Sequence, residues 1–298
     1  MVRALYSAYS GPLYLVQRKA DLATAAIGVS AADGFAESKA QDAFCAGTNC
    51  TVTRIFDQSP KGNHLSIAPS GGAARHADRG VNASKHKITV GGHAVYGAYF
   101  EGGNGYRCES TWGVATGDEP ESMLMVTGGQ HYNGGCCFDY GNAEIDALDH
   151  GKGTMEAIYW GNSSGWGHGV GKGPWVMADL ENGLWAGSDK NGSTNFPIDA
   201  TFVTAMAKGK SGVFGLKGGD ATQSGGLKVR TSRSNVVLAR CCCLLLPACC
   251  CLLPAACCSC CSSCRCSCCC CLLLLLQLLL LLPAAPAAAP AAAAVRSH

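Results

Sequence analysis

Two carboxylates stand two positions apart in residues 175–183, whose sequence is WVMADLENG. On a β-strand, residues two apart point to the same face, so Asp179 and Glu181 would share one face while Leu180 turns to the other. Such a pair can cleave a glycosidic bond, because one carboxylate attacks or stabilises the anomeric centre while an acidic group protonates the leaving oxygen. The spacing is also typical of a solvated strand face or a calcium site. The carboxylates stand in a Trp-rich, polar neighbourhood, as glycoside hydrolysis needs, with Trp160, Trp166, Trp175 and Trp185.

A second unusual feature is the adjacent pair Cys136 and Cys137, in residues 133–140 (NGGCCFDY). Their Cα atoms would lie about 3.8 Å apart, whereas disulfides usually span roughly 4.4–6.8 Å. A bond between them would close a strained ring and leave a hard apolar plate, which could suit the flat face of a sugar. The alternative is a pair of reduced, buried thiols.

Cysteine use differs along the chain. Of 21 cysteines, only Cys45, Cys50, Cys108, Cys136 and Cys137 precede residue 240, which leaves 16 after it. Two close pairs in the front part predict disulfides and an oxidising compartment. The first residues do not form the apolar segment of a signal peptide. Glycosylation sequons, which agree with secretion, occur at Asn49, Asn82, Asn162 and Asn191.

The charge balance excludes several kinds of partner. Residues 241–298 hold two basic and no acidic residues, so the remaining 21 Lys+Arg balance 21 Asp+Glu in residues 1–240. A neutral front part argues against nucleic acid or an anionic membrane as the partner.

Residues 241–295 are runs of Cys, Leu and Ala broken by Pro and Ser. These three residues are what the three reading frames of one CTG repeat encode, and the composition lacks any periodicity that could define a core. We expect residues 228–298 to be a low-complexity tail, either disordered or a gene-model artefact. A metal-binding cysteine cluster and a membrane anchor over residues 272–282 are the alternatives; the latter segment is short of the roughly 20 residues that span a bilayer.

Residues 1–227 have the rhythm of an antiparallel β-sandwich, with short β-rich runs between Gly, Asn, Ser and Pro turns. One helix is expected over residues 36–44, with Gly47 just past its end. The expected strands cover residues 51–57, 88–100, 122–127, 155–160, 175–181, 202–207 and 213–216.

Four segments together resemble the α-L-arabinofuranosidases of glycoside hydrolase family 54. They are residues 3–14 (RALYSAYSGPLY), 56–65 (FDQSPKGNHL), 135–144 (GCCFDYGNAE) and 173–184 (GPWVMADLENGL). The resemblance implies an all-β sandwich of the jelly-roll or concanavalin-like kind, here incomplete at its C-terminal strands. It further implies a secreted enzyme, monomeric and without metal or cofactor, that releases terminal arabinofuranose from plant cell-wall polysaccharide with retention of configuration.

The resemblance also assigns roles to residues. Glu181 matches the family nucleophile, and Cys136 and Cys137 match a vicinal disulfide that lines the sugar site opposite the aromatic at Trp166. Cys45 and Cys50 match a small disulfide loop, which leaves Cys108 without a partner. The remaining arabinose-binding positions match Asp179, Asn182 and Gly183.

The family's acid/base, an Asp in a downstream Gly-Gly-Asp-Asn segment, has no clear match. Asp220 in Gly218-Gly219-Asp220 is a weak candidate, and we interpret it as a residue of an earlier turn. Loss of a general acid costs about 10²–10⁴-fold in rate, so we expect the chain as written to have little activity. The alternatives are a non-catalytic, lectin-like sandwich that binds arabinose and a chain tethered to a membrane.

Overall fold

The computed structural model describes residues 2–70, 76–116, 119–135, 138–142, 155–180, 183–185, 192, 194–224, 226–236 and 294–297. The chain divides into two units, Met1–Leu238 with Pro290–His298 and Ala239–Ala289. Every described residue lies in the first unit.

The described fold is an all-β antiparallel sandwich, as the sequence predicts. Its largest sheet has ten strands in the order β12-β11-β10-β9-β16-β7-β4-β3-β1-β2. The strands of the N-terminal part are β1 (Tyr14–Arg18), β2 (Thr24–Ile27), β3 (Cys50–Ile55), β4 (Leu65–Ile67) and β7 (Gly105–Arg107). The others are β9 (Phe138–Asn142), β10 (Glu156–Gly161), β11 (Trp175–Leu180), β12 (Gly183–Trp185) and β16 (Ala294–Ser297).

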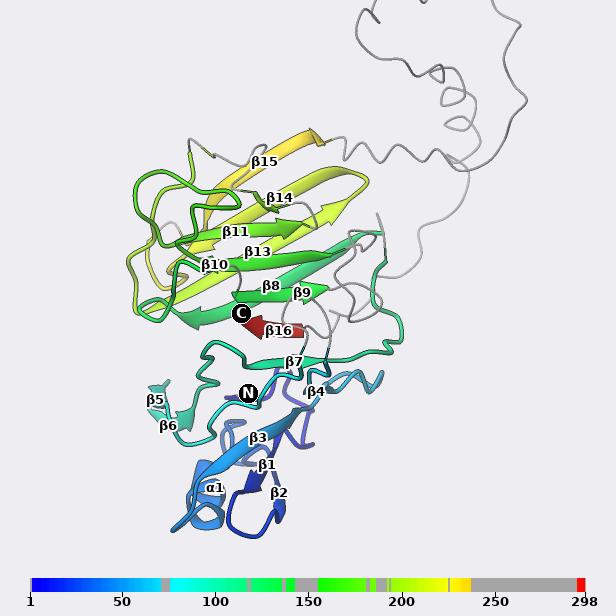
Figure 1. Cartoon of the computed structure of the whole chain (residues 1–298), viewed down its shortest axis with the longest axis vertical. Coiled ribbons are helices and arrows are strands. Elements are labelled where there is room, and N and C mark those ends of the chain that lie inside the picture. The colour runs from blue at the N-terminus through cyan, green and yellow to red at the C-terminus, as the bar shows by residue number, and fades with distance from the viewer. Residues whose placement is uncertain are drawn as a thin grey trace, which may run out of the picture. The chain divides into compact units, whose positions relative to one another are not determined.

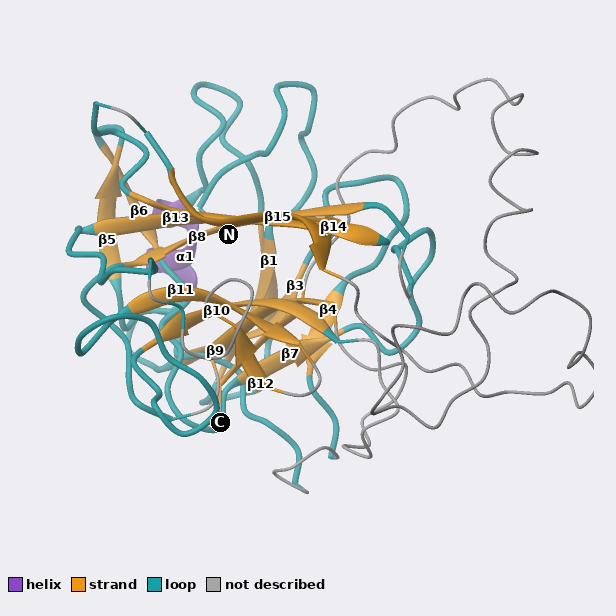
Figure 2. Ribbon diagram, turned by 90° about the horizontal axis from the view of Figure 1, so that it is seen from above, coloured by secondary structure: helices purple, strands orange, loops and turns teal. Residues whose placement is uncertain are grey.

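A second sheet of four strands runs in the order β15-β14-β13-β8. Figure 2 shows this sheet and strands β9–β11 as two layers. The core between the layers is apolar and combines side chains such as Met125, Ile158, Val176, Val203 and Leu216. The strands of this second sheet are β8 (Glu121–Gly128), β13 (Phe202–Lys210), β14 (Gly212–Gly219) and β15 (Lys228–Val236).

A separate core fills the N-terminal part, at the end of the ten-stranded sheet that carries β1–β4 (Figure 1). The helix α1 (Ser38–Phe44) lies here, within the span expected from the sequence, and Gly47 follows it at φ 72°. A disulfide joins Cys45, just after the helix, to Cys50 at the start of β3. This is the pairing that the family resemblance implies. Cys108 is the one free cysteine among the described residues.

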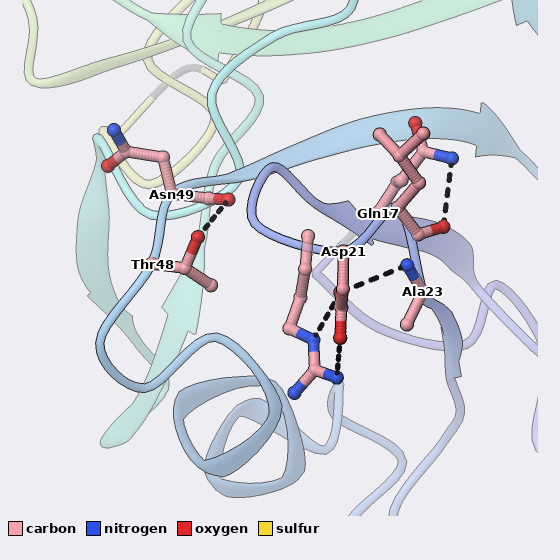
Figure 3. A network of polar contacts seen from close by, with 7 residues as sticks. Gln17, Asp21, Ala23, Thr48 and Asn49 are labelled. Carbon is pink, nitrogen blue, oxygen red and sulfur yellow. Dashed lines mark hydrogen bonds and ion pairs between the residues drawn. The ribbon is translucent and has the colours of Figure 1, made fainter.

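The β1–β2 turn shows how polar contacts fix local structure in this part. The Asp21 carboxylate accepts a hydrogen bond from the Ala23 N–H at 3.1 Å and pairs with Arg18 (Figure 3). The Gln17 amide donates across the same turn to the Leu22 carbonyl oxygen at 3.2 Å. These contacts hold Leu22 at φ 61°, a left-handed conformation that is uncommon for a residue with a side chain.

The continuous strand expected over residues 88–100 is wrong. The structure has a hairpin there, formed by β5 (Lys87–Val90) and β6 (His93–Tyr96). Gly91 and Gly92 connect them with φ values of 56° and 84°. Two positive φ values in a row reverse the chain in a two-residue turn, and glycine adopts them without steric cost.

The boundary predicted at residue 227 stays a prediction. Within the described residues the four-stranded sheet continues past it, because β15 pairs antiparallel with β14. Most of the predicted low-complexity tail, including residues 272–282, lies outside the described residues.

Candidate active site

Strand β11 presents two different faces, as expected of a β-strand. Val176 packs into the core between the two sheets, whereas Trp175 and Met177 belong to a second apolar cluster on the opposite face. Asp179 follows two residues after Met177 and is only 6% exposed. Its carboxylate therefore belongs to the face that points away from the sandwich core, and we call this surface the outer face of the sheet.

The floor of the outer face is apolar and fully packed. It is made by Tyr159 on β10, Trp175 and Met177 on β11, and Leu184 on β12. Burial raises the pKa of Tyr159 to about 12, and the negative charges of Asp139 and Asp179 add to this rise. The Tyr159 hydroxyl therefore stays protonated at neutral pH, and the charges of Asp139 and Asp179 act on it.

The loop that carries Trp166 is tied to strand β12 by a backbone hydrogen bond. In the β11–β12 pair, Asp179 lies opposite Leu184 and Leu180 lies opposite Gly183. The Leu184 N–H donates to the Trp166 carbonyl oxygen at 3.1 Å. The Trp166 side chain is 61% exposed, so an aromatic surface is available to a ligand beside the Asp179 strand.

Four of the predicted site residues are not among those that the structure describes. Glu181, Asn182, Cys136 and Cys137 lie outside the described residues. Strand pairing places Leu180 and Gly183, which flank the first two, directly opposite each other. The roles predicted for the four residues stay predictions.

The predicted tryptophan-rich neighbourhood needs a correction at Trp160. This side chain is 1% exposed and packs in the core between the sheets, so it cannot contact a ligand on the outer face. Trp160 and Tyr159 are adjacent on β10, and adjacent strand residues point to opposite faces. Trp175 does lie on the outer face, but it is buried in the floor and donates from Nε1 to the Val170 carbonyl oxygen at 2.9 Å.

Asp220 lies in a turn after β14. Its carboxylate accepts hydrogen bonds from the Thr222 N–H at 2.9 Å and the Thr222 hydroxyl at 2.7 Å. The hydroxyl of Thr222, then its N–H, and the Gln223 amide lower the pKa of Asp220 below its ordinary value. A general acid needs a pKa raised toward the working pH, so these contacts oppose that role.

A pair of carboxyl groups lies on the core side of the same sheet. Glu121 on β8 and Glu156 on β10 hydrogen bond to each other, and Asn142 Nδ2 donates to Glu121 Oε2 at 2.5 Å. Burial, the hydrogen bond to Glu156 and the charge of Glu156 raise the pKa of Glu121 to about 9. Glu156 lies opposite Leu180, on the strand next to the one that leads into Glu181.

Within the described ranges, no group of three or more His, Cys, Asp or Glu side chains is arranged to hold a metal ion. The described part of the chain also contains no helix that is long and apolar enough to cross a membrane.

Residues 1–234 match the sequence pattern of the family described as "Alpha-L-arabinofuranosidase B, catalytic". The chain belongs to this family. Two further comparisons agree with that assignment. The probable α-L-arabinofuranosidase B of Aspergillus terreus (strain NIH 2624 / FGSC A1156) is 50% identical over 230 residues, which are 76% of this chain and 45% of the relative. The α-L-arabinofuranosidase B of Emericella nidulans is also 50% identical over 230 residues, which are 76% of this chain and 45% of that relative.

Solved structures of this family have the same fold. A GH54 α-L-arabinofuranosidase soaked with a cyclic sulfate inhibitor superposes with a TM-score of 0.74 at 45% identity, covering 78% of this chain and 49% of that one. An arabinofuranosidase complexed with arabinofuranosyl-α-1,2-xylobiose gives the same TM-score at 44% identity and the same coverage. The chain thus spans about half the length of the relatives that it matches.

Two residues of the candidate site were not singled out from the sequence. Asp139 on β9 lies directly opposite Tyr159 on β10. Asp139 could have been suspected, since it follows Cys136 and Cys137 by two or three positions. No sequence pattern pointed to Tyr159, because its neighbours are set by the register of three strands that are distant in sequence.

Proposed function

We propose that this arabinofuranosidase B family chain acts as a retaining α-L-arabinofuranosidase and that Glu181 is its nucleophile. The substrate class is the terminal α-L-arabinofuranosyl group of arabinan or arabinoxylan in plant cell walls. The observation that carries the proposal is the pairing of β11 with β12. It places Asp179 in a buried position on the outer face and joins it through Leu184 to the exposed Trp166, at the end of the sheet that leads into Glu181.

The reaction has two steps in this proposal. The Glu181 carboxylate forms a bond to the anomeric carbon while the glycosidic bond breaks, and an acidic group gives its proton to the leaving oxygen. Water then attacks the same carbon, its proton passes back to that group, and the bond to Glu181 breaks. Two displacements at one carbon leave the configuration unchanged.

The other site residues bind the sugar. Asp179 is buried and acidic, which suits it to accept hydrogen bonds from sugar hydroxyl groups. Trp166 offers an exposed ring for stacking, and Asn182 and Gly183 complete the arabinose contacts. Cys136 and Cys137, bonded to each other, would form the opposite wall. The lowered pKa of Asp220 disfavours this residue as the source of the leaving-group proton.

The relatives support the substrate class. One solved arabinofuranosidase was complexed with arabinofuranosyl-α-1,2-xylobiose, which carries arabinofuranose on a xylan fragment. The Cys45–Cys50 disulfide supports an oxidising compartment, and we propose that the protein works outside the cell as a monomer.

Replacing Glu181 tests the proposal. Glu181→Gln keeps the size of the side chain but removes the nucleophilic charge, so the release of nitrophenol from 4-nitrophenyl α-L-arabinofuranoside should fall to background while the sugar still binds. Glu37→Gln is the control, since Glu37 is exposed and makes no side-chain cap on α1. Turnover of Glu181→Gln at the rate of Glu37→Gln would refute the assignment.

A further inference from the structure

Tyr159 is a buried tyrosine whose hydroxyl joins two loops. Its side chain is fully buried on the outer face of the sheet. The hydroxyl oxygen accepts a hydrogen bond from the Ser163 N–H at 3.0 Å. The same hydroxyl donates to the Gly135 carbonyl oxygen, a long hydrogen bond of 3.4 Å.

The two loops touch at other points as well. The Asn162 N–H donates to the Asn133 carbonyl oxygen at 3.0 Å. Gly161 has no room for a side chain, because an added Cβ would lie 2.3 Å from the Tyr159 hydroxyl oxygen and 2.9 Å from the Asn133 carbonyl oxygen. Residues 133–135 and 161–163 are therefore held against each other with the Tyr159 hydroxyl between them.

Each of these segments is followed in sequence by residues of the proposed sugar site. Gly135 directly precedes Cys136, and Ser163 stands three positions before Trp166. A single hydroxyl thus joins residues 133–135 to the loop that leads to Trp166. Stacking and van der Waals contacts with a sugar depend steeply on the separation of the two surfaces.

We propose that Tyr159 is a positioning residue that holds the loop leading to Trp166 against residues 133–135, and with it sets the affinity for the sugar. This inference rests on the proposed function for the identity of the ligand. Tyr159 acts through the two loops and makes no bond to the reacting atoms. Its ring fills the floor beside Met177, whereas its hydroxyl provides the bridge.

The test separates the contribution of the Tyr159 hydroxyl from that of its ring. Tyr159→Phe keeps the ring and removes only the hydroxyl. Tyr106→Phe is the matched control, because the Tyr106 hydroxyl also accepts from one N–H (Val81, 2.8 Å) and donates to one carbonyl (Val52, 2.7 Å), but in the N-terminal core. Binding of 4-nitrophenyl α-L-arabinofuranoside is measured by calorimetry on the full chain carrying Glu181→Gln, which should bind it without turnover, at a temperature where both variants are folded.

We expect Tyr159→Phe to raise the Kd of this nitrophenyl glycoside about threefold, less than removal of the Trp166 ring, because the loop that carries Trp166 must then be ordered on binding. Tyr106→Phe should lower the melting temperature and leave the Kd unchanged. In a double-mutant cycle with Trp166→Ala, the effect of Tyr159→Phe on the Kd should shrink, because Tyr159 affects the ligand through Trp166. An unchanged Kd in Tyr159→Phe, or full additivity with Trp166→Ala, would overturn the inference.

A second measurement does not need the ligand. Tyr159→Phe should speed amide hydrogen exchange in peptides that cover residues 131–135 and 161–167 together, while Tyr106→Phe should not. If the wild-type chain does not bind the nitrophenyl glycoside, the proposed function fails and the exchange result alone decides the bridge. Exchange that stays at the wild-type rate in either peptide would refute the bridge.

Discussion

The backbone N–H of Leu184 donates to the carbonyl oxygen of Trp166 at 3.1 Å, and this one bond connects the loop after β10 to strand β12. Since Leu184 also lies opposite Asp179, the bond ties the loop that carries the exposed Trp166 to the strand beside the buried Asp179. The combination of aromatic surface and carboxylate is what binding of a furanose ring requires.

Trp166→Ala should weaken binding and leave the fold intact. An aromatic contact of this kind contributes about 1 kcal/mol, so we expect KM or Kd for 4-nitrophenyl α-L-arabinofuranoside to rise roughly fivefold. Because the Trp166 side chain is 61% exposed, the melting temperature should change little. Trp112→Ala is the matched control: Trp112 is 71% exposed, on a loop that the Asn63 side chain holds. Equal losses of affinity in both variants would contradict a specific role of Trp166.

The Glu121–Glu156 pair should make the fold less stable as the pH rises. Because the pKa of Glu121 in the folded chain is raised from 4.5 to about 9, the folded state holds a proton that the unfolded state releases. This contribution to stability is fully present below about pH 4.5 and is lost as the pH rises through about 9. Melting temperatures across this range measure the effect.

Glu121→Gln should flatten that pH dependence, because an amide stays neutral at every pH. Near the raised pKa the variant should be more stable than the wild type by on the order of 1–3 kcal/mol, the usual cost of burying an unsatisfied group. The described charged residues on the adjoining strand β13, Lys208 and Lys210, lie on the opposite face and should not compensate. A wild-type melting curve that is flat between acid and alkaline pH would contradict the assignment.

Asp220→Asn should have little effect on catalysis. The carboxylate holds the turn at residues 220–223, and its pKa is lowered, so we expect arabinan hydrolysis to stay within about threefold of the wild type. Removal of a general acid would instead cost about 10²–10⁴-fold on arabinan and much less on a nitrophenyl substrate, whose leaving group needs little protonation. That pattern of loss would identify Asp220 as the acid.

Cys136 and Cys137 should be bonded to each other, and this bond should be reduced more readily than the Cys45–Cys50 bond. Peptide mapping under non-reducing conditions would find each pair within a single peptide. Titration with a thiol reductant would then open the adjacent pair first. A bond from either residue to Cys108 would remove the basis for an apolar plate at the sugar site.

Local sequence patterns predicted the strands that show clear alternation. The strand expected at residues 175–181 is present as β11 (Trp175–Leu180), so the shared face of Trp175, Met177 and Asp179 could be foreseen from strand geometry. Strands of three residues, such as β4, β7 and β12, were missed because so short a segment carries no period. The hairpin at 87–96 was missed because β-rich residues flank Gly91 and Gly92 on both sides and hide the turn between them.

Long-range register explains the rest of the site. Whether Trp160 or Tyr159 lies on the outer face depends on the orientation of β10, which its pairing with neighbouring strands determines. For the same reason, the bridge that Tyr159 makes between Ser163 and Gly135 has no local sequence signature. The bulk of the fold followed from composition and alternation, whereas the contacts between loops followed only from the packed sheets.

The most direct test of the central claim is to trap the covalent step. A cyclic sulfate inhibitor of the kind soaked into a related GH54 enzyme is incubated with the full chain, and the labelled peptide is then sequenced by mass spectrometry. We predict a single label on Glu181, lost in Glu181→Gln and retained in Glu37→Gln. A label on Asp179 or Asp220, or a label that survives in Glu181→Gln, would contradict the assignment of the nucleophile.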